Sequence, residues 1–181
     1  VGPSFAMLNA MKFIADHPNV KYDYLIQLGI AGCFDTTIPL GTVFNVIEDQ
    51  FLVGAWENEV LFNSVDEMGF NSIFKRSSRV KSFKVIELKS SLPYGEGLTV
   101  STIESNKARI KVLKSTFPFA VIESMEGAAF HYVCLKEKIP FIQIRAISNQ
   151  VGDRNKANWK MKEAIETLNT AIIQLIKELS K

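Results

Sequence analysis

The sequence predicts a single α/β domain in which helices flank a mixed, largely parallel central sheet. The chain has 181 residues, about the length of one domain, and 47% of them are hydrophobic, which is enough to build one core. Short apolar runs of strand length alternate with stretches whose apolar residues recur at helical spacing. This alternation is typical of an α/β domain, and no internal repeat interrupts it.

The strands are predicted from apolar runs bounded by turn residues. The first run stops at Gly29-Ile30-Ala31-Gly32, which we interpret as a tight glycine turn. The second follows the turn Pro39-Leu40-Gly41, and the last is apolar enough to lie in the centre of the sheet. The predicted strands cover residues 24–28, 42–47, 97–102, 119–122 and 141–147.

The helices are predicted from apolar residues three and four positions apart. The last one, from Trp159 to Leu179, has the most regular spacing and should pack one face on the sheet. Residues 57–80 are rich in Asn and Ser and are predicted to form a long irregular excursion. The predicted helices begin at Pro3 and end near His17, and then cover residues 104–117, 125–138 and 159–179.

The beginning of the chain looks like the middle of a fold. Val1-Gly2-Pro3 leads straight into the first helix, whereas a strand normally precedes such a helix in an α/β domain. We therefore expect residues 1–181 to form one α/β domain that is N-terminally incomplete, with the preceding strands missing.

Composition and motifs exclude several functions. A net charge of +2 is too small for non-specific nucleic-acid binding, and no apolar run approaches the roughly 20 residues that span a bilayer. Cys33 and Cys134 form no paired motif, which suits a reducing cytoplasm, and two histidines do not support a metal site. Gly95-Glu96-Gly97 precedes a predicted strand and is not a dinucleotide fingerprint. We expect neither metal nor cofactor.

Three predicted strand ends become polar or rich in glycine, at residues 29–32, 123–127 and 145–149. Ligands in α/β sheets bind beyond the carboxyl ends of the strands, so these segments should meet at one site. Glu126 either marks a helix N-terminus or, buried beside small residues, accepts hydrogen bonds from a vicinal diol such as ribose. Ser148 and Asn149 either cap a turn or read a lactam edge, and Arg145 either faces the site or pairs locally with a carboxylate.

The motifs Glu123-Ser124-Met125-Glu126-Gly127-Ala128-Ala129 and Arg145-Ala146-Ile147-Ser148-Asn149 resemble the nucleoside phosphorylase and nucleosidase superfamily. The resemblance extends to residues 28–32 and covers most of the chain. Residues 145–154, followed by Trp159, look most like the futalosine hydrolases of menaquinone biosynthesis. The resemblance implies a nucleoside phosphorylase-like fold and a soluble homo-oligomer whose neighbour contributes apolar residues to the pocket.

The activity implied by this resemblance is cleavage of the N-glycosidic bond of a purine nucleoside, through an oxocarbenium-like sugar. By analogy, Glu126 holds the ribose hydroxyls and Asn149 faces the base. Methylthioadenosine/S-adenosylhomocysteine nucleosidases carry an acidic Asp at the position of Asn149. An amide cannot donate that proton but can donate to a 6-oxo group, which favours hypoxanthine, the base of futalosine.

The resemblance also bears on the nucleophile. Gln27 and Ile30 stand where related phosphorylases have an Arg and a Ser that grip phosphate, so water is the expected nucleophile, oriented by a Glu on the missing N-terminal strand. The catalytic candidates are Asn149 and Glu126. The substrate-binding candidates are Ile30, Ala31, Gly32, Thr102, Ile103, Ser124, Met125, Ser148 and, for the aromatic carboxylate of futalosine, Arg154.

Three alternatives stay open at this point. The first is a methylthioadenosine/S-adenosylhomocysteine-type nucleosidase, and the second is an inosine-type purine nucleoside phosphorylase. The third is a nucleoside-binding sensor domain of the same fold that lacks the water-activating carboxylate.

Overall fold

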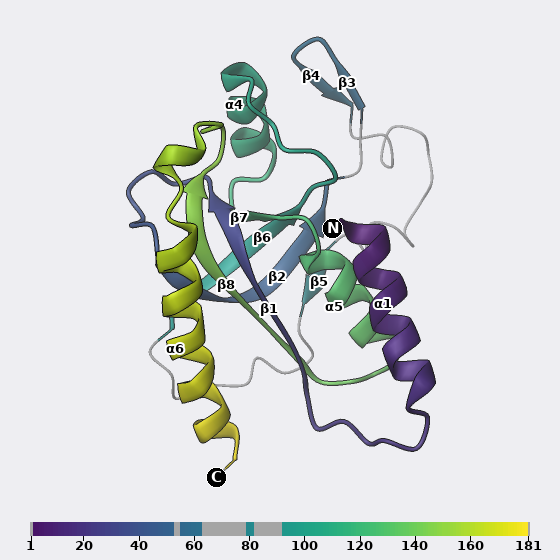
Figure 1. Ribbon diagram of the computed structural model, residues 1–181. Helices are drawn as coiled ribbons and strands as arrows, with labels where there is room; N and C mark the ends of the chain where they lie inside the picture. The colour runs from purple at the N-terminus through teal and green to yellow at the C-terminus, as the bar shows by residue number, and fades with distance from the viewer. Residues whose placement is uncertain (1, 53–54, 63–78, 82–91, 181) are drawn as a thin grey trace.

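The computed structural model describes residues 2–52, 55–62, 79–81 and 92–180 of the chain (Figure 1). The predicted excursion at 57–80 lies mostly outside these residues. The strands are β1 (Leu25–Cys33), β2 (Val43–Phe51), β3 (Ala55–Glu57), β4 (Val60–Phe62), β5 (Arg79–Lys81), β6 (Tyr94–Thr99), β7 (Ala120–Ser124) and β8 (Phe141–Gln150). The helices are α1 (Pro3–Asp16), α4 (Lys107–Thr116), α5 (Gly127–Lys136) and α6 (Met161–Leu179), with a short 3-10 turn η1 (Lys156–Asn158) before α6.

The central sheet is mixed and its long ladders are parallel, as predicted. Its strand order is β5-β2-β6-β7-β1-β8, and β2 also pairs with β8, so the sheet closes on itself. The pairs β1–β8, β2–β6 and β6–β7 are parallel, whereas β1–β7, β2–β5 and β2–β8 are antiparallel. The β1–β8 ladder runs from Leu25↔Phe141 to Cys33↔Gln150, while β1 and β7 meet only at Gly32↔Glu123 and Cys33↔Ile122.

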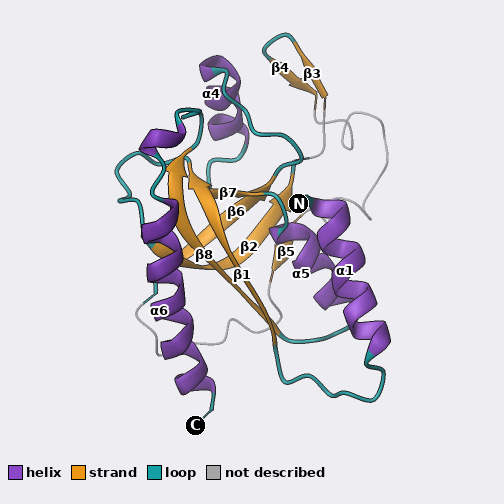
Figure 2. Cartoon of the chain, in the orientation of Figure 1, coloured by secondary structure: helices purple, strands orange, loops and turns teal. Residues whose placement is uncertain are grey.

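Helices cover the sheet on separate sides (Figure 2). Helix α6 packs along β8 and β1, whereas α5 packs on β2 and β6 and carries α1 on its outer side. None of the helices in the described ranges is long and apolar enough to cross a membrane.

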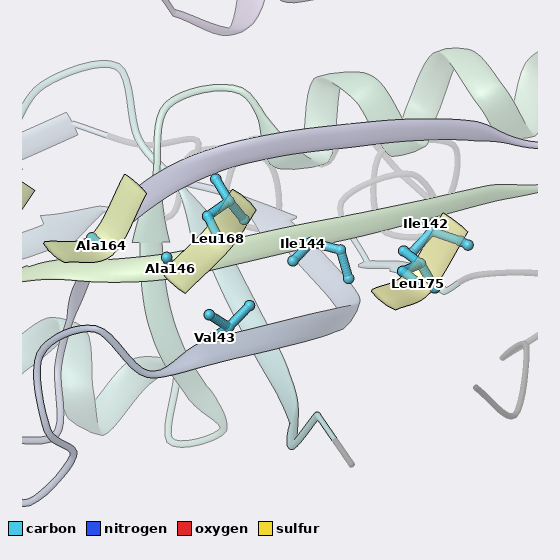
Figure 3. Packing of buried hydrophobic residues seen from close by; sticks show 7 residues of the cluster. All are labelled: Val43, Ile142, Ile144, Ala146, Ala164, Leu168 and Leu175. Carbon is cyan, nitrogen blue, oxygen red and sulfur yellow. The ribbon is translucent and has the colours of Figure 1, made fainter. Parts of the chain in front are cut away.

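One core cluster joins α6 to the sheet (Figure 3). Ala164 and Ala146 are both fully buried, and their small side chains let the helix approach β8 closely. Leu168, one turn after Ala164, and Leu175, about three turns after it, pack in the same cluster. The helical spacing predicted these contacts. However, Ile165 and Ile176 are about half exposed, so the predicted apolar face is only partly covered.

Two expectations about element ends were wrong for one physical reason. Residues 29–32 do not form a turn, because β1 continues through them to Cys33 with a bulge between Ala31 and Gly32. Likewise, β8 continues beyond Ile147 to Gln150. Each strand gives the other a ladder of hydrogen bonds that the local sequence does not reveal. The other boundaries differ by a few residues, and α5 starts at Gly127 instead of Met125.

The two glycines of β1 provide room for side chains. Neither has a left-handed backbone, unlike Gly41 and Gly152. A Cβ on Gly29 would overlap the Arg145 guanidinium, and one on Gly32 would lie 3.1 Å from a Val151 methyl. The glycines therefore stand where side chains from other parts of the chain pack directly against the backbone of β1.

Candidate active site

A cleft of about 580 Å³ opens where β1, β7 and β8 come together. This volume lies in the range of small-molecule sites. The cleft takes its lining from three stretches of strand and from the segment before α6. The lining residues are Gln27, Leu28, Gly29, Ile30, Ala31, Gly32, Val100, Ile103, Glu123, Ser124, Met125, Glu126, Arg145, Ser148, Asn149, Trp159 and Met161.

The structure brings most of the predicted site residues together in this cleft. Its lining includes Glu126 and Asn149, and also Ile30, Ala31, Gly32, Ile103, Ser124, Met125 and Ser148. Thr102 and Arg154 are exposed and lie outside the lining. Arg154 follows the end of β8 in the loop that leads to η1, so the cleft in this conformation does not include the residue expected to meet a substrate carboxylate.

Glu126 stands directly before α5 and faces a buried cation. Its Oε2 lies 3.8 Å from Nη1 of Arg145, whose side chain is 3% exposed, and its Oε1 accepts a hydrogen bond of 3.2 Å from the Gly2 amide. The second arm of the Arg145 guanidinium donates to Gln27 Oε1 at 2.8 Å. Burial lowers the pKa of Arg145, while Asp49 and Glu126 oppose that effect through their charge. The pair thus fixes a carboxylate at the cleft wall.

A buried polar cluster holds the start of α5 beneath this pair. Asp49 is fully buried, and it accepts hydrogen bonds from Thr99 Oγ1 at 2.7 Å and Gln143 Nε2 at 3.1 Å. The same Thr99 oxygen accepts the amide of Ala128 at 2.8 Å, so the first turn of α5 is tied to the cluster. Burial raises the pKa of Asp49 to about 6, although its hydrogen bonds and Arg145 favour the charged form.

Asn149 has its amide oriented by two neighbours. Its Oδ1 lies 2.9 Å from Ser148 Oγ, which can donate to it, and its Nδ2 donates to the Gln150 carbonyl at 3.1 Å. An amide nitrogen carries two hydrogens, so one N–H remains for a ligand. Because Nδ2 lies 3.4 Å from the point where a Cβ of Gly32 would stand, the amide nitrogen sits beside the cleft floor.

Glu123 is a cleft residue that the sequence analysis did not select. It is 6% exposed, and its Oε2 has no hydrogen-bond partner among the described residues. Burial, and to a lesser degree the nearby charge of Glu104, raises the pKa of Glu123 to about 7. A glutamate in an otherwise apolar strand, three residues before Glu126, was the available signal, because charged residues are seldom buried without a reason.

Apolar side chains supply the rest of the cleft wall. Trp159 approaches from the segment before α6 and Met161 from the first residue of that helix, and Met125 comes from the turn between β7 and α5. The indole nitrogen of Trp159 donates to the Asp153 carbonyl at 2.9 Å, which fixes the ring. Such walls suit the flat faces of a base and a sugar.

The charges around the cleft do not favour binding of a dianion such as phosphate. Arg145 is the one cation among the described lining residues, and Glu123 and Glu126 are the two acidic residues of that lining. The guanidinium is already engaged by Glu126 and Gln27. In the described part of the chain, no group of three or more His, Cys, Asp or Glu side chains is arranged to hold a metal ion.

The whole chain, residues 1–181, matches the family model of the phosphorylase superfamily. The futalosine hydrolase of Streptomyces coelicolor is 30% identical over 156 residues, which cover 85% of this chain and 65% of that protein. The 5'-methylthioadenosine/S-adenosylhomocysteine nucleosidase of Marinomonas sp. is 27% identical over 171 residues, covering 86% of this chain and 69% of that protein. The chain thus spans about two thirds of the length of these curated relatives.

Solved structures have the same fold. The futalosine hydrolase of Helicobacter pylori superposes with a TM-score of 0.75 at 16% identity, covering 98% of this chain and 76% of that one. A nucleosidase from Colwellia psychrerythraea in complex with adenine gives a TM-score of 0.77 at 20% identity, covering 99% and 75%. The α/β fold with a nucleoside phosphorylase-like mixed sheet is therefore confirmed. With the family model matched from end to end, the chain belongs to the phosphorylase superfamily.

Proposed function

We propose that this protein hydrolyses the N-glycosidic bond of a 6-oxopurine nucleoside, with futalosine as the substrate and hypoxanthine as the released base. The observation that carries the proposal is the orientation of Asn149. Among the described residues, Nδ2 donates one N–H to the Gln150 carbonyl and keeps the other for a ligand, while Oδ1 lies next to the Ser148 hydroxyl. A donor there matches a 6-oxo group and opposes a 6-amino group.

The relatives support the reaction class. The matched proteins from Streptomyces coelicolor and Marinomonas are named as a futalosine hydrolase and a nucleosidase. We extend the first of these activities to this chain, which places it in menaquinone biosynthesis. Two free, buried cysteines are in keeping with a reducing, cytoplasmic location.

The ribose end of the cleft supports bond cleavage through a cationic sugar. Glu126 places a carboxylate beside the position that we assign to the ribose, and its oxygens retain lone pairs for two hydroxyl groups. The negative charge also stabilises an oxocarbenium-like transition state. Met125 supplies an apolar surface next to it.

Water is the proposed nucleophile. A phosphate dianion needs free cations, and the single described cation at the cleft is already bound to Glu126 and Gln27. Ile30 offers no side-chain donor. These features disfavour a phosphorylase.

A second candidate is a methylthioadenosine/S-adenosylhomocysteine nucleosidase, because several relatives, including the Marinomonas enzyme, carry that name. Asn149 argues against it, since its amide N–H would face the 6-amino group of adenine, which is also a hydrogen-bond donor. The sensor-domain alternative predicts binding without turnover.

The test is incubation of the full-length protein with futalosine, inosine and methylthioadenosine, each with and without phosphate, followed by analysis of the released base. We expect phosphate-independent release of hypoxanthine from futalosine. Release of adenine alone would favour the second candidate, and a strict requirement for phosphate would identify a phosphorylase.

A further inference from the structure

A buried carboxyl group faces the cleft with one oxygen unpaired. Glu123 is the penultimate residue of β7 and is directly paired with Gly32 of β1 in an antiparallel register. Its Oε2 is buried and has no hydrogen-bond partner within the described residues, although an unpaired buried carboxyl oxygen is costly. An unpaired buried oxygen of this kind calls for an explanation, and one in the lining of a cleft is a candidate for completion by a ligand.

Glu123 and Asn149 lie next to each other across Gly32. A Cβ on Gly32 would stand 3.7 Å from Glu123 Oε1 and 3.4 Å from Asn149 Nδ2. Paired residues in an antiparallel ladder direct their side chains to the same face, so the missing side chain of Gly32 leaves space between these two groups. The glycine therefore opens the cleft floor where both polar groups can reach one ligand.

We propose that Glu123 is the general acid of the reaction: its protonated carboxyl donates a hydrogen bond to N7 of the 6-oxopurine and transfers that proton as the base leaves. This inference rests on the function proposed above. It names the proton donor that Asn149 cannot be.

The two cleft carboxyls have different surroundings, which separates their roles. Glu126 forms an ion pair with Arg145, so it acts as a fixed negative charge beside the sugar. No cation among the described residues forms an ion pair with Glu123, and burial together with the charge of Glu104 favours its neutral form. With a pKa of about 7, Glu123 is partly protonated at neutral pH, and the protonated carboxyl is the form that a general acid requires.

Glu123 and Asn149 also form a pair of donors. The major-groove edge of a 6-oxopurine presents two acceptors, N7 and O6, whereas a 6-aminopurine presents an acceptor and a donor. A protonated Glu123 facing N7 and an Asn149 N–H facing O6 match the first pattern. The pair thus reads a 6-oxopurine, while a buried acceptor opposite O6 would reject it.

The proton and the electrons balance in this step. The C1′–N9 bond breaks and its electron pair stays on the base, while the Glu123 proton moves to N7. Water forms a bond to C1′ and loses one proton, which restores the acid form of Glu123 through solvent. The sum is nucleoside plus water giving free sugar and neutral base.

The kinetic test compares Glu123→Gln with the wild-type protein over a range of pH, with futalosine and inosine as substrates. Wild-type kcat/KM should fall above about pH 7, as Glu123 loses its proton. In Glu123→Gln we expect kcat/KM to drop by at least about 10²-fold and this limb to disappear. Glu123→Asp should restore the limb, and the surface control Glu166→Gln should behave as wild type. A Glu123→Gln enzyme with wild-type turnover and an unchanged pH profile would overturn the proposal.

A binding experiment distinguishes failure of this proposal from failure of the proposed function. Hypoxanthine binding, measured by calorimetry, should weaken as the pH rises above neutrality in the wild-type protein and be independent of pH in Glu123→Gln. If no nucleoside is cleaved but this difference is found, hydrolysis is wrong and the donor role of Glu123 at the base is supported. Equal pH dependence in both proteins overturns the role of Glu123 whether or not nucleosides are cleaved.

Discussion

Within one short segment, Glu123 and Glu126 flank Met125 and line the same cleft, yet their environments are opposite. Glu123 is 6% exposed and its Oε2 lacks a hydrogen-bond partner in the part of the chain that the structure describes, whereas Glu126 has Arg145 at 3.8 Å. Such a contrast lets two chemically identical groups act as acid and as fixed charge. The single-residue predictions concern this pair and the amide beside it.

Glu126→Gln should leave the fold intact and remove most turnover. The amide keeps the shape of the side chain but loses the charge that stabilises the cationic sugar. We expect kcat on futalosine to fall by at least about 10²-fold, the effect of removing one charge-stabilising group. Steady-state kinetics with a circular dichroism control measure this, and turnover close to that of wild type would contradict the ribose assignment.

Asn149→Asp should shift substrate preference from oxo- to aminopurines. A carboxylate at this position faces the 6-oxo group as a second acceptor, but it can accept from a 6-amino group. Each unsatisfied buried group costs roughly 1–3 kcal/mol, so the ratio of kcat/KM for amino over oxo substrates should rise by about 10²-fold or more. Futalosine and its 6-amino analogue, assayed at one pH, give the ratio. An unchanged ratio would show that Asn149 does not read the base.

Glu123 should make stability depend on pH. Its pKa is about 7 in the folded protein, above the usual value of 4.5, so the folded state binds this proton more tightly than the unfolded state does. The stabilisation is complete below the unfolded pKa and is lost as the pH rises through about 7. Glu123→Gln should therefore melt several degrees higher than wild type at about pH 8 and differ little at about pH 4. If the melting temperatures of the two proteins differ by the same amount at every pH in this range, burial does not raise the pKa of Glu123.

At the scale of elements, the first turn of α5 depends on close packing over Asp49. A Cβ on Gly127 would overlap the side chains of both Asp49 and Gln143. Gly→Ala in a helix normally stabilises by up to about 1 kcal/mol, but here we expect Gly127→Ala to destabilise by about 1–3 kcal/mol because the cluster must move. Urea unfolding gives the free energy of unfolding of the variant and shows whether the substitution stabilises or destabilises the protein.

The neighbouring variant Ala128→Gly is the matched control for that prediction. It keeps the backbone N–H that donates to Thr99. It should cost about 2 kcal/mol, because lower helix propensity and the loss of one fully buried methyl group each contribute about 1 kcal/mol, with cleft activity retained. Gly127→Ala should in addition displace Glu126 and lower turnover. A Gly127→Ala protein that is more stable and fully active would mean that the contact with Asp49 does not position α5.

Elements with a strong local pattern could be predicted from sequence, and their ends could not. The spacing of Ala164, Leu168 and Leu175 predicts the buried side of α6 correctly. In contrast, Gly29 and Gly32 look like a turn because glycine is common in turns, and only the distant partner Arg145 explains the first of them. The roles of such glycines depend on side chains more than a hundred residues away, and the pattern of neighbouring residues does not show these contacts.

At the scale of the whole molecule, the place of β1 in the sheet creates the site. β1 pairs with β8 on one side and with β7 on the other, which brings the three cleft strands together, and the pairing of β2 with β8, from Val43↔Ala146 to Asn45↔Ile144, closes the sheet. The sequence predicted that polar segments would meet, because parallel strands end at one edge. It did not predict Glu123, since its burial and its unpaired oxygen depend on antiparallel contact with Gly32.

The rim of the cleft leads to a last prediction, that a second copy of the chain covers it. Three apolar lining residues, Leu28, Ile103 and Met161, are 43%, 41% and 43% exposed. Contiguous exposed apolar surface beside a binding site is typical of an interface, and the family resemblance implies a homo-oligomer. We expect light scattering after gel filtration to give a dimer or a larger homo-oligomer, and specific activity to fall on dilution as the copies dissociate.

Variants locate the interface in this last prediction. Leu28→Glu should shift the protein towards monomer, because a charge cannot be buried there without a partner. Phe119→Glu, at a residue that is 64% exposed and outside the cleft lining, should leave the assembly unchanged. A wild-type protein that stays monomeric, with specific activity independent of concentration, would contradict the prediction. Dissociation by Phe119→Glu and not by Leu28→Glu would place the interface away from the cleft, and the single chain would then have to form the whole pocket.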